Sequence, residues 1–150
     1  MTPFPLATAL LAPAALLVVW SLVMLVWMGI VRGAAFKATG ISFGKIPPGG
    51  RGQDLDKLLP PPANWPAHNY VHLMEQPTLF YATVLILALL GQGTTINLAM
   101  AWGYAALRII HSIWQARFNI VAVRATLFLL STLALMILAV NALRAALGAA

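Results

Sequence analysis

Cysteine is absent from these 150 residues, so the chain forms no disulfide, no thiolate metal site and no thiol nucleophile of its own. Charge is also scarce, because Asp, Glu, Lys and Arg make up 8% of the residues, against about a quarter in soluble domains. Hydrophobic residues make up 61%. We therefore predict an all-α, multi-pass integral membrane protein, with a single domain over residues 1–150 and no separate soluble domain.

Acidic residues are the rarest charged class: three Asp and Glu stand against nine Lys and Arg, which gives a net charge of +6. The basic residues are spread thinly and lack the clustered stripe with interleaved aromatics that is typical of nucleic-acid-binding proteins. Nucleic acid is therefore not expected as a partner. The placement of the cations is instead expected to report the topology in the lipid bilayer.

Apolar runs predict four spans, over about residues 6–32, 67–90, 96–115 and 120–143, since about 20 apolar residues cross a bilayer. Two of the three connections are short, which favours an up-down-up-down bundle of four transmembrane helices. The first run is longer than the apolar region of a signal peptide, and no Lys or Arg precedes it. Pro13 is expected to kink or offset its first turns.

The connection over residues 33–66 is predicted to be mostly irregular, because PPGG at 47–50 and PPP at 60–62 interrupt regular structure. One interfacial turn is expected over residues 54–59. Lys37, Lys45, Arg51 and Lys57 make this loop basic. By the positive-inside rule the loop is therefore cytoplasmic, and both termini lie on the opposite side of the membrane.

Glu75 is the one Asp or Glu in the sequence that falls within a predicted span, and the candidate site is predicted around it. A carboxylate in hydrocarbon is costly, so we expect Glu75 to face the bundle interior and to pair with a cation. His68, His72 and Glu75 fall at i, i+4 and i+7, which places them on one face of a helix.

Candidate partners for Glu75 lie on the last two spans. Arg108, His111 and Gln115 fall at i, i+3 and i+7 of the third span, and Arg124 lies near the start of the fourth. At about 1.5 Å of rise per residue, these side chains reach similar depths in the half of the bilayer nearer the first loop. With Arg32 as a rim cation, we predict one cavity with surplus positive charge, which suits an anionic ligand.

Other interpretations of these residues stay open. A Glu75–Arg108 pair would also serve simply to lock two helices together. His68 and His72 have the spacing of a helical metal pair that Glu75 or His111 would complete, and histidine ligation of haem or contact with a quinone is a further possibility. The shortage of carboxylates and histidines argues against a di-iron centre.

In layout, nearly the whole chain resembles the MAPEG superfamily, the membrane-associated proteins of eicosanoid and glutathione metabolism. The matching pieces are E-x-x-x-x-F at Glu75–Phe80, A-x-R-I-I-H at Ala106–His111, and Arg124. The resemblance implies a homotrimer with a site between neighbouring protomers. It also implies glutathione as cofactor and a lipophilic small molecule, delivered from the lipid bilayer, as substrate.

The resemblance further implies that Arg124 is the catalytic residue, which would stabilise a thiolate. His68, His72 and Gln115 take places where active relatives tend to carry Arg, Asn and Tyr. The residues predicted to bind glutathione are Glu75, Arg108, His111, His72, His68, Gln115 and Arg32. The expected function is a glutathione-dependent transferase or peroxidase. The alternative is a non-catalytic membrane scaffold, a lipid-binding protein or an accessory subunit of a larger membrane complex.

Overall fold

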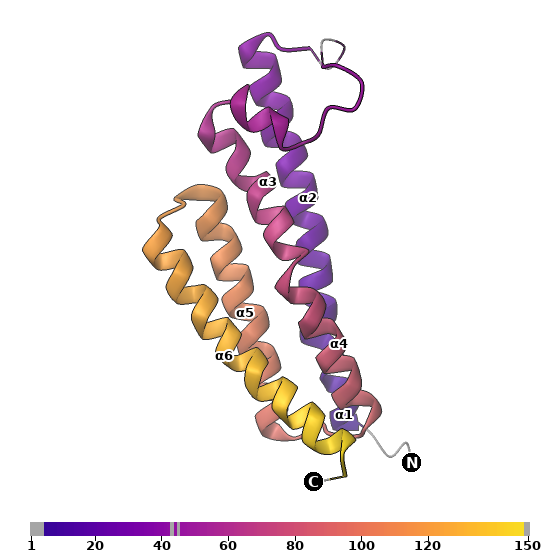
Figure 1. The fold of residues 1–150 in the computed structure, drawn as a ribbon. Coiled ribbons are helices and arrows are strands. Elements are labelled where there is room, and N and C mark those ends of the chain that lie inside the picture. The colour runs from indigo at the N-terminus through magenta and orange to yellow at the C-terminus, as the bar shows by residue number, and fades with distance from the viewer. Residues whose placement is uncertain (1–4, 43, 45, 149–150) are drawn as a thin grey trace.

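The computed structural model describes residues 5–42, 44 and 46–148, and the regular elements in this part of the chain are helical. Four long rods lie alongside one another: α2, the pair α3 and α4, α5, and α6 (Figure 1). The predicted all-α four-helix bundle is confirmed. The elements are α1 (Pro5–Ala9), α2 (Leu11–Thr39), the 3₁₀ helix η2 (Asp54–Lys57), α3 (Pro61–Leu73), α4 (Gln76–Leu89), α5 (Thr95–Arg117) and α6 (Val121–Ala146).

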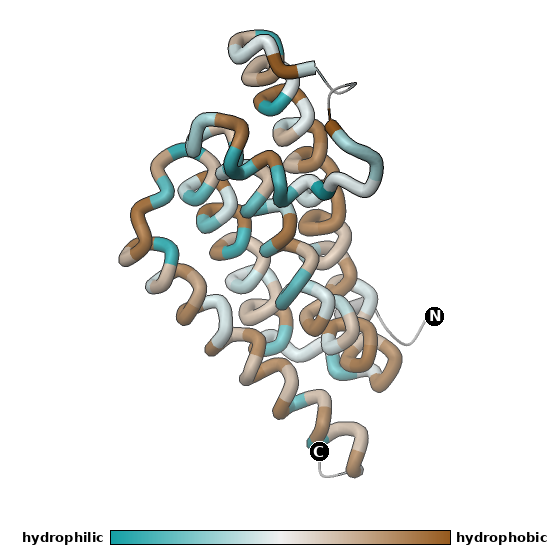
Figure 2. Tube along the Cα trace, turned by 45° about the horizontal axis from the view of Figure 1, so that its top comes forward, coloured by the Kyte–Doolittle hydropathy of each residue, from teal (hydrophilic) through white to brown (hydrophobic). Residues whose placement is uncertain are grey.

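Three helical segments of the described chain are long and apolar enough to cross a membrane: Ala7–Thr39, Pro61–Leu89 and Val121–Ala146. Hydrophobic colour dominates much of their length, whereas hydrophilic colour gathers over the first loop (Figure 2). The remaining rod, α5, is more polar because it buries Asn97, Arg108 and Gln115 against its neighbours. The chain is thus a multi-pass integral membrane protein whose third rod directs polar groups inward.

The first rod is longer than the sequence predicted, because α2 continues past Arg32 to Thr39. Residues 33–39 contain no proline, and Gly40 ends the helix in the left-handed conformation, at φ 68°. At the far end of the loop, α3 already begins at Pro61, since proline is tolerated in the first turn of a helix. The predicted irregular loop over residues 33–66 is therefore too long, although η2 does supply the expected turn.

A one-residue interruption between two helices near the N-terminus agrees with the expectation that Pro13 offsets the first turns. Helix α1 ends at Ala9 and α2 begins at Leu11, which puts Pro13 in the first turn of α2. There its missing N–H costs no helical hydrogen bond.

The second rod is broken in its middle, where a continuous helix was expected. Between α3 and α4, Glu75 adopts φ −89° and ψ −97°, which is not helical. Pro77 accounts for the break, because it has no N–H to offer the carbonyl of Leu73 and its ring crowds that carbonyl. The two halves still run in nearly the same direction (Figure 1).

The core between the rods is apolar over most of its length, and Phe80 stacks on Tyr104 with ring centroids 4.3 Å apart. Asn97 and Asn141 join α5 to α6 at the end that also holds α1 (Figure 1). The first loop lies at the opposite end. The polar groups considered below lie between these two ends, nearer the loop.

Candidate functional site

The centre of the polar cluster is Arg108 of α5, which is 1% exposed. Its Nη2 donates to the backbone carbonyl of His72 at 2.9 Å, and its Nη1 lies 3.3 Å from His72 Nε2. A guanidinium group only donates hydrogen bonds, so Nε2 of His72 is the acceptor and the imidazole proton lies on Nδ1. Arg108 thus binds both the backbone and the ring of the same residue.

Glu75 lies at the other side of the His72 ring. His72 Nδ1 donates to Glu75 Oε2 at 2.9 Å, and the Glu75 side chain is 63% exposed. The prediction that Glu75 faces the bundle interior is therefore wrong for the protomer, because the break after α3 turns the carboxylate outward. An imidazole joins Glu75 to Arg108 in place of a direct ion pair.

Buried and aromatic groups enclose His72 on its remaining sides. The His111 ring lies 5.1 Å from the His72 ring, and the Phe128 ring lies 5.4 Å from it, measured between centroids. His111 Nε2 is 3.1 Å from Gln115 Oε1, and both side chains are buried. The predicted shared face of Arg108, His111 and Gln115 therefore points into the bundle.

Arg124 of α6 completes this cluster, whose other basic members lie on α3 and α5. Its Nη1 donates to Oδ1 of Asn119, a residue held at φ 56° in the turn between α5 and α6. Three buried nitrogen atoms in the cluster have no hydrogen-bond partner among the described residues: Nε of Arg108, Nε of Arg124 and Nδ1 of His111. The two arginine Nε–H groups are donors, whereas Nδ1 of His111 is an acceptor because Nε2 of that ring donates to Gln115 Oε1. Buried polar groups are normally satisfied, so these atoms mark a place where polar groups of a ligand are expected.

A cavity of about 210 Å³ lies between α3, α5 and α6, beside these nitrogen atoms. Its wall is basic on one side and apolar on the other. The lining residues are His72, His111, Val121, Arg124, Ala125 and Phe128.

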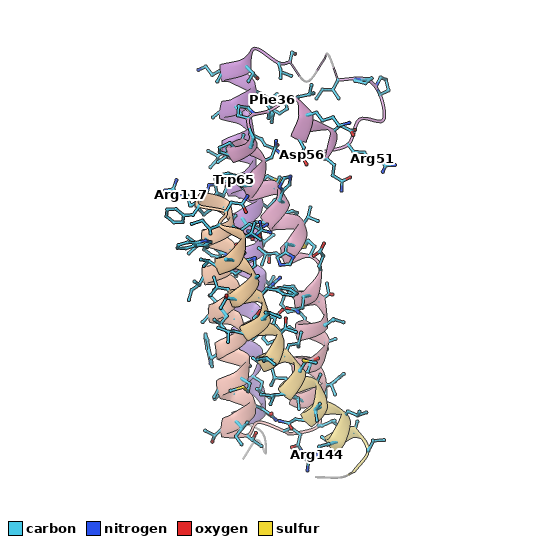
Figure 3. All side chains as sticks on the ribbon, turned by 60° about the vertical axis from the view of Figure 1, so that its left-hand side comes forward. Phe36, Arg51, Asp56, Trp65, Arg117 and Arg144 are labelled. Carbon is cyan, nitrogen blue, oxygen red and sulfur yellow. The ribbon has the colours of Figure 1, made fainter. Side chains whose placement is uncertain are left out.

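Arg32 and His68 lie in a different groove, between α2, α3 and the first loop. Asp56 of η2 binds both: its Oδ2 is 2.8 Å from His68 Nε2, and its Oδ1 is 3.6 Å from Arg32 Nη2. Asp56 lies in the connection between α2 and α3, at the end of the molecule opposite Arg144 (Figure 3). A cavity of about 300 Å³ adjoins them. The predicted single cavity is thus wrong within one protomer, because a loop carboxylate draws Arg32 and His68 to a second cluster.

Sequence reasoning missed three residues that shape these two clusters: Asp56, Asn119 and Phe128. Asn119 carried a usable signal, since Asn tolerates the left-handed conformation and here directly follows a helix end. Phe128 carried none, because it is one apolar residue in an apolar span.

The metal interpretation gains no support from the part of the chain that the structure describes. No three His, Asp or Glu side chains there are grouped to hold an ion. His68 and His72 have helical metal spacing but belong to different clusters.

Together these features define a class: a multi-pass helical membrane protein in which three helices bring cationic and imidazole groups to one cavity. The chain belongs to the MAPEG family, whose family model matches residues 10–144. This confirms the resemblance, and the family fold is a four-helix membrane bundle. Comparison with curated proteins and with solved structures gives no match.

Proposed function

We propose that this chain is a glutathione-dependent transferase or peroxidase that acts on lipophilic substrates, with Arg124 as its catalytic residue. The observation that carries the proposal is the group of unpartnered buried nitrogen atoms beside the α3–α5–α6 cavity. The unpartnered donor of Arg124, with the buried charge of Arg108 behind it, suits a carboxylate of an anionic peptide, which a guanidinium binds with charge-assisted hydrogen bonds. Family membership supports the same ligand.

The cavity wall supports a lipophilic second substrate. Val121, Ala125 and Phe128 present hydrocarbon next to Arg124, on a helix that crosses the bilayer. Bound glutathione would supply the sulfur nucleophile that this cysteine-free chain lacks. The guanidinium of Arg124 would hold positive charge beside the thiol and favour its thiolate form. His111 lies in the same wall, with a buried ring nitrogen that has no partner among the described residues.

The size of the cavity supports a site shared between protomers. At about 210 Å³ it is smaller than the roughly 300–1,000 Å³ typical of small-molecule pockets, so a tripeptide needs a further wall. In a cyclic homotrimer each contact joins two different faces of the chain. The groove with Arg32 and His68 on one protomer would then face the cavity with Arg124 on the next, and the exposed Glu75 would be covered.

Charge placement supports an orientation with the first loop in the cytoplasm and both termini on the opposite side. Lys37, Arg51 and Lys57 lie at the loop end, whereas Arg144 lies at the other end, as Figure 3 shows for Arg51 and Arg144. Cationic loops favour the cytoplasmic side. The proposed site then lies nearer the cytosol, where glutathione is abundant.

Calorimetry of glutathione binding in detergent tests the proposal. We expect Arg124→Ala to weaken binding by about tenfold to a hundredfold, because a hydrogen bond to a charged group contributes roughly 1.5–3 kcal/mol. Arg117→Ala is the matched control, since Arg117 lies near the same turn but is exposed and contacts Trp27, outside the cavity lining. Its affinity should stay within about twofold of the wild type, which is less than 0.5 kcal/mol.

No heat from the wild type at millimolar glutathione would exclude this function. It would favour a non-catalytic scaffold, a lipid-binding protein or an accessory subunit of a larger membrane complex. One observation already points that way: His68, which takes the place of a family arginine, is bound to Asp56. Co-purification of a stoichiometric partner would then be the next measurement.

A further inference from the structure

Helix α3 ends inside the membrane-spanning bundle, and its end needs a hydrogen-bond donor. The break at Met74 and Glu75 and the ring of Pro77 interrupt the helical ladder there. An unsatisfied backbone carbonyl in the hydrocarbon region is strongly unfavourable, because no water is there to hydrogen-bond it. Water satisfies such groups at the ends of helices in soluble proteins, but here the donor has to come from the protein.

Arg108 supplies that donor. In an uninterrupted helix the carbonyl of His72 accepts from the amide four residues on. Here it accepts from Arg108 Nη2, at 2.9 Å. The guanidinium also lies at the C-terminal end of α3, where the helix dipole favours a positive charge. The hydrogen bond to the His72 carbonyl and the favourable helix dipole explain how Arg108, which is 1% exposed, is accommodated without a direct carboxylate partner.

The same guanidinium fixes the imidazole of His72. With Nη1 donating to Nε2, the ring proton stays on Nδ1 and is donated to Glu75. The polar chain therefore runs from a buried cation through a neutral ring to an exposed carboxylate. Both terminal nitrogens of Arg108 are used in this chain.

We propose that Arg108 is a positioning residue, which caps the broken end of α3 and directs His72 and Glu75 toward the outer face of the bundle. Its part in any reaction is indirect, and that part rests on the function proposed above. The cap itself is a property of the protein alone and is testable without glutathione.

Because the chain has no cysteine of its own, two introduced cysteines can be spin-labelled selectively and the distance between α3 and α4 can be measured. Val71→Cys and Leu85→Cys place spin labels on exposed positions of α3 and α4, which are 47% and 51% exposed. With labelled chains diluted into an excess of unlabelled copies, so that pairs within one chain dominate, we expect one narrow distance distribution in this background and a broad or shifted one after Arg108→Met. Arg108→Lys keeps the charge but cannot bind two acceptors in fixed geometry, so it should be intermediate.

Pro77→Ala is the rescue variant. It restores a backbone donor and removes the crowded ring, so α3 and α4 can join and the need for the cap disappears. The pair Pro77→Ala, Arg108→Met should therefore recover a narrow distribution, and it should fold even if Arg108→Met alone does not. An unchanged distribution in Arg108→Met, or failure of the pair to fold where Pro77→Ala folds, would overturn the proposal.

Nitrogen-15 spectra of labelled histidine provide a readout that general loosening of the bundle would not reproduce. The wild type should show His72 protonated at Nδ1, with the signal assigned by its loss in His72→Asn. After Arg108→Met we expect a mixture of the two neutral tautomers. Persistence of the single Nδ1–H form would contradict the proposal. Because no ligand is added, the result is independent of whether glutathione binds.

Discussion

At the scale of single residues, Asn119 holds the proposed catalytic arginine. Its Oδ1 accepts from Arg124 Nη1, and its backbone is in the left-handed region at φ 56°. These two roles are separable, because glycine keeps the backbone conformation and removes the acceptor. An alanine at this position would lose the hydrogen bond and add backbone strain.

We therefore expect Asn119→Gly to weaken glutathione binding by about threefold to tenfold, as expected for one lost hydrogen bond of about 1 kcal/mol. Its thermal stability in detergent should change little. Asn119→Asp keeps the acceptor but adds a negative charge beside Arg124, so it should keep the turn and still weaken binding of the anionic ligand. Calorimetry and a melting curve for the three proteins check this. Equal affinity in Asn119→Gly and the wild type would mean that Arg124 needs no support from the turn.

At the scale of helices, the spans were predictable because hydrocarbon selects long apolar runs, and charge-free residues 6–31 could hardly be anything else. The break before Pro77 was less accessible. Proline is compatible with a kink or with a helix start, and the choice depends on Arg108, a donor far along the chain. The outward turn of Glu75 follows from that choice, so the wrong orientation of Glu75 and the missed break have one cause.

Arg32 and His68 lie apart from the cavity for a similar reason, because their partner Asp56 belongs to a different element. Helical spacing correctly placed His68 one turn from His72, toward the loop. It gave no sign that Asp56, across an irregular loop, would bind His68. Spacing therefore predicted the faces of helices, whereas loop conformation decided which charges meet.

Gln76 connects three rods just beyond the break. Its Nε2 donates to Thr132 Oγ1 at 2.9 Å, and its Oε1 accepts from Tyr104 at 3.3 Å. We expect Thr132→Val to destabilise the bundle by about 0.6 kcal/mol, the average for interhelical hydrogen bonds in a membrane. Thr126→Val is a matched control, since the Thr126 hydroxyl is exposed and donates to the carbonyl of Ala122 in its own helix.

Unfolding in mixed detergent micelles would compare the two valine variants. Thr132→Val should be the less stable one. If both variants unfold at the same denaturant concentration, the Gln76 contact contributes nothing beyond the local bond that each threonine makes within α6.

At the scale of the whole molecule, the chain carries two polar grooves, which in the proposed trimer would each supply half of a site. One holds Arg124, and the other holds Arg32 with His68. If a trimer joins the first groove of one copy to the second groove of the next, every site needs two chains. Two damaged proteins can then restore each other, which no site within a single protomer permits.

Co-expression of Arg124→Ala with Arg32→Ala tests this arrangement. Each variant alone should bind glutathione weakly, because every site lacks one arginine. In a mixed trimer, one contact of the three joins the two intact halves. Since three quarters of randomly assembled trimers are mixed, about a quarter of the wild-type number of sites should return at wild-type affinity. Calorimetry of the unfractionated trimers gives that number, and purification through different tags on the two variants, which keeps only mixed trimers, should raise it to about a third. Full loss of tight sites in the mixed preparation would place both arginines of each site within one protomer. Tight binding by Arg32→Ala alone would instead mean that Arg32 has no part in the site.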